Sequence, residues 1–284
     1  MTEQAKFDKR EADLRFFLAA GRELLQVDDL HLGLWEDGVE VNLRNIGVAQ
    51  EAHSQLMLSH IPEGTKTVLD VGCGVGKLSE RLLEQGYEVE AVTPSHFLAG
   101  EARKLIGGDF KVYECCIEDI EVERQYDVVL FSESFQYVKM ERGFEKILAL
   151  LKPGGHLMIC DFLTNDVEEK SPLSGGPRWS RFRELVAELP LEQLEDIDIT
   201  EETAPTMDLA DGVLTRLFKP AFELVLETMR ARSPWLSKLA EWKFKKKIEK
   251  LEWRYFRGAW SGEQFKKFKS YRLVLFRKTG EASA

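Results

Sequence analysis

The stretch VLDVGCGVG, residues 68–76, decides the fold of this 284-residue chain. An apolar run typical of a buried strand carries Asp70, and Gly72, Gly74 and Gly76 follow in the turn before a helix. Glycines in such a turn let the backbone bend sharply and let a ligand approach without meeting a Cβ atom. The spacing differs from the G-x-G-x-x-G of dinucleotide-binding folds. An acid before the glycines would repel a pyrophosphate, but it suits a ligand with a cationic ammonium group.

Strand and helix patterns alternate after this turn. Strands are expected at 88–92, 110–114, 127–132 and 156–162, and helices at 96–106 and 141–151. A short helix near 179–188, a strand at about 194–200 and a last strand at 270–278 complete the series. Strands separated by helices indicate right-handed crossovers and a mostly parallel sheet. The sequence therefore predicts an α/β, Rossmann-like, doubly wound sheet of seven strands with an antiparallel last strand.

Two helical regions flank this pattern. Residues 1–64 carry amphipathic helices and form an N-terminal prelude, and residues 65–205 form the ligand-binding core. Residues 206–268 are a long helical stretch with breaks at Pro220 and Pro234. Because this stretch stands between the last two strands, we interpret it as a helical lid inserted before the final strand and tail, residues 269–284.

Several motifs, in order, resemble the class I S-adenosylmethionine-dependent methyltransferases. DVGCGVG (70–76) resembles the cofactor loop of this family, YDVVLFSES (126–134) its fourth strand and following loop, and LKPGGHLMI (151–159) the turn into its fifth strand. The resemblance covers about residues 65–165. It is nearest to the branch of cyclopropane fatty-acid synthases and tocopherol and sterol C-methyltransferases, in which a similar threonine stands after the second strand.

The resemblance implies S-adenosyl-L-methionine as the cofactor and assigns residues to it. Asp70, Gly72, Gly74 and Gly76 would hold the methionyl end of the cofactor. The resemblance implies five further cofactor contacts. They are Thr93 and Pro94 after the second strand, Ile117 and Glu118 in the adenine-binding turn, and Ser132 at the end of the fourth strand. Thr93 stands where the family usually has an acid for the ribose, and a threonine offers one hydrogen bond rather than two. Glu118 near the adenine amine has a competing interpretation as a solvated surface acid.

The reaction centre is expected at the loop after the fourth strand. Methyl transfer is an in-line displacement, so the protein mainly positions the acceptor, and a base is needed only when the acceptor must lose a proton. Glu133 could balance positive charge on the acceptor, and Tyr137 stands where many relatives have a histidine. HLGLW (31–35) resembles a loop that closes over the cofactor in tocopherol- and sterol-type enzymes, which makes His31 a catalytic candidate and Trp35 a cofactor contact. For each of these residues, a packing or loop-orienting role remains an alternative.

The C-terminal region has an unusual charge. Residues 230–278 hold 16 Lys and Arg against four Asp and Glu, although the whole chain has a net charge of −10. Trp235, Trp242, Trp253 and Trp260 are interleaved with these lysines. A basic, Trp-bearing amphipathic helix suits an anionic membrane surface or a lid over an apolar substrate. An ordinary packed helix with solvated lysines is the alternative, and no nucleic-acid module is visible.

These patterns lead to a prediction of function. We expect a methyltransferase for a small, apolar, lipid- or isoprenoid-like acceptor, with N- or O-methylation of a polar natural-product scaffold as the alternative and a non-catalytic binding protein as a third. We expect a cytoplasmic protein, with peripheral membrane contact left open. The four cysteines form no C-x-x-C pair, the first residues are polar, and no apolar run is long enough to span a bilayer. His53, His60, His96 and His156 are interpreted as structural, and no metal site is expected.

Overall fold

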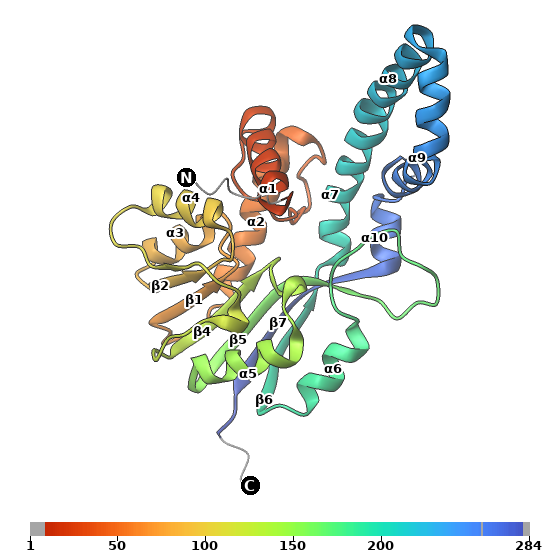
Figure 1. Ribbon diagram of the computed structural model, residues 1–284. Coiled ribbons are helices and arrows are strands. Elements are labelled where there is room, and N and C mark those ends of the chain that lie inside the picture. Colours follow the sequence, from red (N-terminus) through yellow and green to blue (C-terminus); the bar gives the residue numbers. More distant parts are fainter. Residues whose placement is uncertain (1–8, 257, 281–284) are drawn as a thin grey trace, which may run out of the picture.

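The computed structural model describes residues 9–256 and 258–280. Seven strands form one sheet in the order β3-β2-β1-β4-β5-β7-β6, and β7 runs antiparallel to both of its neighbours (Figure 1). The strands are β1 (Thr67–Val71), β2 (Glu88–Val92), β3 (Val112–Tyr113), β4 (Tyr126–Ser132), β5 (Leu151–Thr164), β6 (Leu191–Asp198) and β7 (Lys269–Lys278). The predicted Rossmann-like sheet with an antiparallel last strand is confirmed.

Helices cover both faces of the sheet, and the reason is the alternation of side chains along each strand. In β4, Val129 and Phe131 point to one face, where they join a cluster with residues of α5 (Met140–Leu150) and α6 (Trp179–Ala187). Val128 and Leu130 point to the other face. The helices on that face are α2 (Ile46–Ser59), α3 (Lys77–Glu84), α4 (His96–Ile106), α7 (Thr200–Val213) and α10 (Gly262–Phe268). Successive side chains of a strand point to opposite faces of the sheet. Because helices cover both faces, the same strand contributes to one apolar core on each side.

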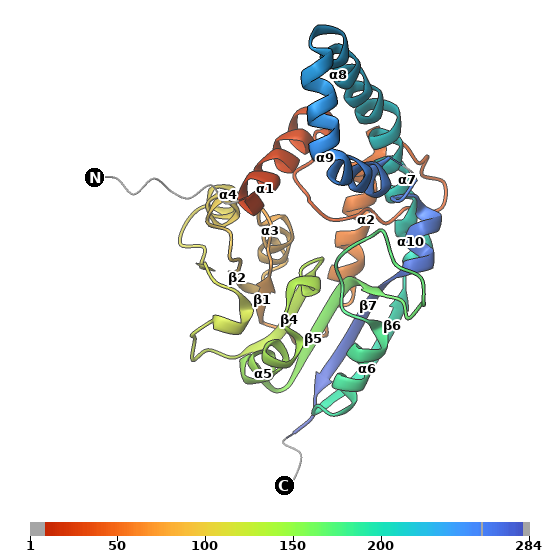
Figure 2. The same cartoon turned by 45° about the vertical axis from the view of Figure 1, so that its right-hand side comes forward.

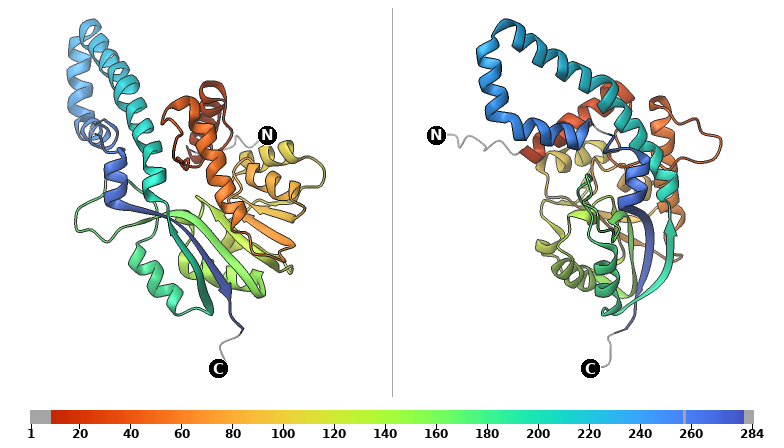
Figure 3. Two further views of the ribbon diagram at one scale, coloured as in Figure 1. Left: turned by 180° about the vertical axis from the view of Figure 1, so that it is seen from behind. Right: turned by 90° about the vertical axis from the view of Figure 1, so that its right-hand side faces the viewer.

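Two helical groups stand beyond the carboxyl ends of the parallel strands (Figure 3, left). One is the N-terminal region, where Leu18 of α1 (Lys9–Ala20) is buried against Val75 and Leu98 and so covers the glycine loop. The other is the insertion between β6 and β7. It begins with α7 at Thr200 rather than at residue 206, because strand β6 ends at Asp198.

The insertion projects from the body as a helical hairpin (Figures 1 and 2). Its arms are α8 (Lys219–Arg232) and α9 (Pro234–Tyr255), and the break between them falls at Pro234 as predicted. Pro220 lies in the first turn of α8, after an irregular helical turn at Leu214–Phe218, so the helical path continues past it. Within the described ranges, no helix is both long and apolar enough to cross a bilayer.

Candidate active site

The glycine loop has the backbone that its sequence requires. Gly72, Gly74 and Gly76 all have positive φ angles, of 80°, 56° and 90°, a region that side chains with a Cβ rarely adopt. A Cβ at Gly72 would lie 2.2 Å from the Cβ of Ser134, so the loop packs directly against the segment after β4. A Cβ at Gly74 would meet no described atom within 4 Å. The loop therefore leaves open space at Gly74, where a ligand can contact bare backbone.

Asp70 is buried directly below this loop. Its side chain is 1% exposed, and Oδ2 accepts a hydrogen bond of 2.6 Å from the Ser79 hydroxyl. Burial raises the pKa of Asp70 to about 6 because a charged carboxylate is poorly solvated there, although the Ser79 bond opposes the shift. A buried carboxylate with one hydroxyl partner would gain from a nearby cation. This is the chemistry expected for the ammonium group of a methionyl ligand.

The other predicted cofactor residues occupy the same edge of the sheet. Thr93 follows β2 and is buried, and its Oγ1 accepts a hydrogen bond from the Ser95 amide, 3.3 Å away. Pro94 beside it is exposed, and Ser132 ends β4. Two further candidates have contacts within the protein: Ile117 is buried in the core, and Glu118 accepts a hydrogen bond from the Lys139 amide. The structure thus places all five positions near the strand ends without assigning them a ligand.

Glu133 follows β4 in a backbone conformation that is rare for a residue with a side chain. Its φ is +48°, in the left-handed region, which costs a non-glycine residue of the order of 1–2 kcal/mol. The carboxylate accepts hydrogen bonds from the Leu32 amide and from the Tyr271 hydroxyl, the latter at 2.8 Å. Burial raises the pKa of Glu133, while nearby His31 and these hydrogen bonds oppose the rise. Strain of this kind concentrates at functional sites, so Glu133 is the strongest catalytic candidate by its geometry.

Two histidine rings lie beside this carboxylate. His31 and His53 stack with their centroids 4.4 Å apart, and His53 Nε2 lies 2.8 Å from the Tyr271 hydroxyl and 3.3 Å from the Cys160 thiol. Burial and the neighbouring His31 hold the pKa of His53 well below its usual value. For His31, burial favours the neutral ring, but the pairing with Asp29 outweighs it and raises the pKa. The site thus holds one neutral imidazole next to one that favours the proton.

The remaining predicted residues lie elsewhere. Tyr137 ends the short helical turn Phe135–Tyr137, and its side chain is 79% exposed, so it does not join Glu133 and His31. Trp35 is buried, and its Nε1 donates a hydrogen bond of 2.8 Å to the Thr206 hydroxyl. This contact ties the N-terminal loop to α7 of the insertion. The structure therefore brings two of the three predicted catalytic residues together.

Three members of this cluster were missed by the sequence analysis: His53, Tyr271 and Asp29. His53 was interpreted as structural because nothing within its own helix marks it, and its partners lie 107 and 218 residues away at Cys160 and Tyr271. Tyr271 lies within the last strand predicted at 270–278, and nothing in the sequence of that strand marks it as a site residue. Only the register of β7 beside β5, which pairs Tyr271 with Phe162, shows that its hydroxyl reaches the carboxyl edge.

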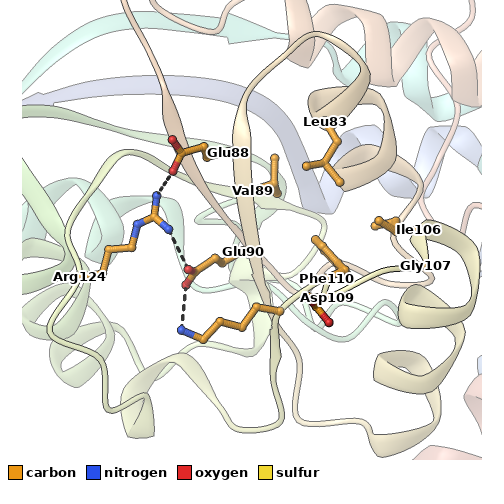
Figure 4. A pocket seen from close by; sticks show the side chains of 10 residues that line it. Leu83, Glu88, Val89, Glu90, Ile106, Gly107, Asp109, Phe110 and Arg124 are labelled. Atoms are coloured by element: carbon orange, nitrogen blue, oxygen red, sulfur yellow. Dashed lines mark hydrogen bonds and ion pairs between the residues drawn. The ribbon is translucent and has the colours of Figure 1, made fainter.

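A hollow of about 410 Å³ lies at the outer side of β2, and it is not this site (Figure 4). Four of its charged side chains already have partners, because Arg124 pairs with Glu88 and Glu90 and Lys111 also pairs with Glu90. The Tyr126 hydroxyl donates a further hydrogen bond to Glu90. A closed network of this kind stabilises the sheet edge rather than recruiting a ligand.

Comparison with known sequences identifies the family of the chain. Residues 47–197 match the methyltransferase domain family, more than half of the chain. An uncharacterized methyltransferase of Mycobacterium tuberculosis is 30% identical over 97 residues, which is 34% of this chain and 40% of that protein. The match thus spans about two fifths of the relative's length. A cypemycin N-terminal methyltransferase of a Streptomyces species is 28% identical over 215 residues, 73% of this chain and 81% of the relative.

Solved structures share the fold over nearly the whole chain. A geranyl diphosphate C-methyltransferase of Streptomyces coelicolor, solved with Mg²⁺, geranyl diphosphate and S-adenosyl-L-homocysteine, aligns with a TM-score of 0.64 at 17% identity, covering 97% of this chain and all of that one. A 4+2 cyclase aligns with a TM-score of 0.61 at 17% identity, over 95% of this chain and 96% of the other. At such identities the likeness establishes the fold alone. Together with the family match, it shows that the chain belongs to the S-adenosylmethionine-dependent methyltransferases of class I.

Proposed function

We propose that the protein transfers a methyl group from S-adenosylmethionine to a small acceptor with a largely apolar body. One observation carries the proposal: the open backbone at Gly74 and the cluster of Glu133 and His31 lie on the same edge of the sheet, joined through the contact of Gly72 with Ser134. A site for a methyl donor and a site for an acceptor would have to be adjacent in this way, because in-line displacement needs the reacting atoms about 3–3.5 Å apart.

The residues of the loop fit the cofactor that the family uses. The backbone at Gly74 leaves room for the methionyl chain, and buried Asp70 would favour its ammonium group. When bound, the cofactor supplies an activated methyl group on a sulfonium. The protein contributes position and electrostatics: Glu133 faces positive charge as it forms on the acceptor, and the Leu32 amide and Tyr271 hydroxyl hold its carboxylate in place. In its neutral form His31, which lies beside Asp29, can accept a proton from an acceptor that must lose one.

The helical insertion supports the apolar character of the acceptor. It stands at the carboxyl edge of the sheet, and its hairpin exposes large apolar side chains, among them Leu224 at 64%, Trp235 at 69% and Trp242 at 78%. Lys243, Lys245 and Lys246 lie exposed on α9, the arm that also carries the two tryptophans. Exposed apolar groups next to cations suit contact with an anionic lipid surface, from which an apolar acceptor could be taken. We therefore propose peripheral membrane contact through α8 and α9.

The experiment that tests the proposal supplies radiolabelled S-adenosylmethionine and fractionated lipid and polar extracts to the purified protein. Label is expected in the lipid fraction, with one S-adenosylhomocysteine formed per methyl group transferred. Glu133→Gln should lower the turnover at least 100-fold and leave cofactor affinity within twofold, because the carboxylate faces the acceptor. Label in neither fraction, despite cofactor binding, would contradict the proposed activity.

Methylation of a nitrogen on a polar natural product is the second candidate. The observation in its favour is the relative that methylates the N-terminus of cypemycin, which matches 73% of this chain. In that case label should appear in the polar fraction. Deletion of the hairpin tip should then leave turnover unchanged.

A further inference from the structure

The cluster at the end of β4 contains an arrangement that the proposed function leaves unused. His31, His53 and Glu133 come from three separate segments, and one ligand atom from each lies within 4.8 Å of the other two. An ion placed among atoms at this spacing lies no more than about 2.8 Å from each, whereas zinc–nitrogen bonds measure about 2.0–2.1 Å. In the present arrangement the two imidazole rings stack with their centroids 4.4 Å apart, so to bind one ion the rings would have to turn as well as move each ligand atom by about 0.7 Å.

The surroundings hold each of these side chains in the way that metal ligands are usually held. His31 Nδ1 bonds to the Leu32 carbonyl and His53 Nε2 to the Tyr271 hydroxyl, both at 2.8 Å. Tyr271 also donates to the Glu133 carboxylate, so one hydroxyl orients two of the three side chains. Metal-binding histidines commonly use their second nitrogen in such a hydrogen bond, which fixes the ring and leaves the first nitrogen for the ion.

One atom in this cluster lacks a partner. The His53 side chain is fully buried, yet its Nδ1 has no hydrogen-bond partner among the described residues. Leaving a buried polar atom unpaired costs about 1–3 kcal/mol, and such atoms call for an explanation such as a bound ion or water. Because Nε2 lies against the Tyr271 hydroxyl and the Cys160 thiol, Nδ1 is the nitrogen of His53 that has no partner among the described residues.

We propose that His31, His53 and Glu133 bind a divalent transition-metal ion, of which zinc is the type that two imidazoles and one carboxylate suit best. This donor set favours zinc, iron or cobalt over magnesium and calcium, which prefer oxygen ligands throughout. Three protein ligands leave at least one coordination position open. Asp29, whose Oδ1 lies 3.6 Å from His31 Nε2, adds a second negative charge beside the ion.

A metal ion at this site would select an acceptor that carries a group able to bind the ion. This step rests on the proposed function. An open position next to the glycine loop would take a hydroxyl, amine or thiol on an otherwise apolar acceptor. Coordination withdraws electron density and lowers the pKa of that group, so its proton leaves before or during methyl transfer. The new bond would then form between the acceptor heteroatom and the methyl carbon while the carbon–sulfur bond breaks, and the proton released from the acceptor would pass to water.

The test titrates untagged, chelator-treated protein with Zn²⁺ by calorimetry, and with Co²⁺ by visible absorption. One ion per chain is expected, with binding at least 100-fold weaker in both His53→Ala and Glu133→Gln. Tyr271→Phe, which removes only the orienting hydroxyl, should weaken binding about 10–100-fold. His96→Ala is the matched control, because His96 pairs with Glu114 on the surface far from the cluster in sequence, and it should bind the ion unchanged.

Binding of S-adenosylhomocysteine reports whether each variant is folded, and His31→Ala replaces His53→Ala if the buried substitution prevents folding. Absence of one-to-one binding of both ions, or unchanged binding in the His53 and Glu133 variants, would overturn the metal site. Methyl transfer by metal-free protein, unaffected by added Zn²⁺, would overturn the role for the ion while leaving the proposed function in place. Stoichiometric metal binding without methyl transfer to any fraction would support the site and contradict the proposed function.

Discussion

The strands of the core and the arms of the hairpin use the same apolar residue types with opposite results. Leu69 and Phe131 of the core are completely buried, whereas Trp235 and Trp242 of the hairpin are 69% and 78% exposed. The apolar pattern of the core is explained by its own fold, because helices cover both faces of the sheet. The described part of the chain does not bury Trp235 and Trp242 of the hairpin in the same way. Exposed apolar surface of this kind is typical of interaction sites, which is why we propose a membrane contact for the hairpin.

Matched truncations should give the largest effect and sharpen this comparison. Phe131→Ala removes a ring that packs 5.3 Å from Phe135, and we expect a loss of about 3–5 kcal/mol in the free energy of unfolding. Trp242→Ala should change that free energy by no more than about 0.5 kcal/mol, because the larger ring is already in solvent. Urea denaturation followed by circular dichroism measures both. Equal losses of unfolding free energy in the two variants would show that Trp242 is packed in solution, and that core and hairpin do not differ in burial.

The same contrast explains which elements could be predicted. The core elements follow from local patterns: helix 96–106 and strand 88–92 coincide with α4 and β2. Where local signals conflict, the boundaries shift. The predicted strand at 156–162 is extended back to Leu151 in β5, because Leu151 pairs with Tyr126 before Pro153 and two glycines interrupt the register. A Pro-Gly signal in sequence indicates a turn, and only the neighbouring strand shows that pairing continues around it.

The candidate site also has one part that a local motif predicts and one part that depends on contacts between distant residues. The glycine loop is a local motif, so Asp70 and its glycines could be identified from nine consecutive residues. The candidate reaction centre is assembled from side chains at positions 29, 31, 53, 133 and 271, which share no local pattern. Glu133 was identified through its place after a strand, but its contact with Tyr271 spans 138 residues. Non-local contacts of this kind depend on strand register, which one sequence does not specify.

The next prediction concerns the open backbone at Gly74. Gly74→Asp would fill the space at the loop and place a negative charge beside the carboxylate of the methionyl group, and aspartate tolerates the positive φ of 56° better than most residues. Cofactor affinity should fall at least 100-fold, about 2.7 kcal/mol. Gly86→Asp is the control, since Gly86 also has a positive φ and no atom within 4 Å but lies in the turn before β2. Calorimetry showing equal affinity in both variants would remove the loop from the cofactor site.

Asp70 should give this site a moderate dependence on pH. Its pKa of about 6 in the free protein means that the carboxylate is mostly ionised at pH 7 and mostly protonated at pH 5. An ammonium group binds the ionised form, so cofactor affinity is retained above pH 6 and lost as the pH falls through it. We expect about tenfold weaker binding at pH 5 than at pH 7, since one pKa unit corresponds to about 1.4 kcal/mol. Asp70→Asn should abolish the dependence in calorimetric titrations, and a flat profile in the parent protein would contradict the pairing.

The smallest expected effect tests the exposed arm of the hairpin. Lys245 is exposed and forms a 4.0 Å ion pair with Glu249, and a lysine near an anionic membrane contributes about 1 kcal/mol to binding. Lys245→Gln should therefore weaken sedimentation with phosphatidylserine vesicles about fivefold, and less so at high salt, which screens the surface charge.

Lys104→Gln is the matched control for that measurement. Lys104 is 78% exposed at its side chain against 73% for Lys245, and it too pairs with a glutamate, but it belongs to α4 of the core. If the hairpin carries the membrane contact, Lys104→Gln binds vesicles as the parent does, and both variants keep their cofactor affinity. Equal losses in the two variants would mean that attraction is spread over the whole surface. A parent protein that does not sediment with anionic vesicles would show that the exposed tryptophans serve a partner other than lipid.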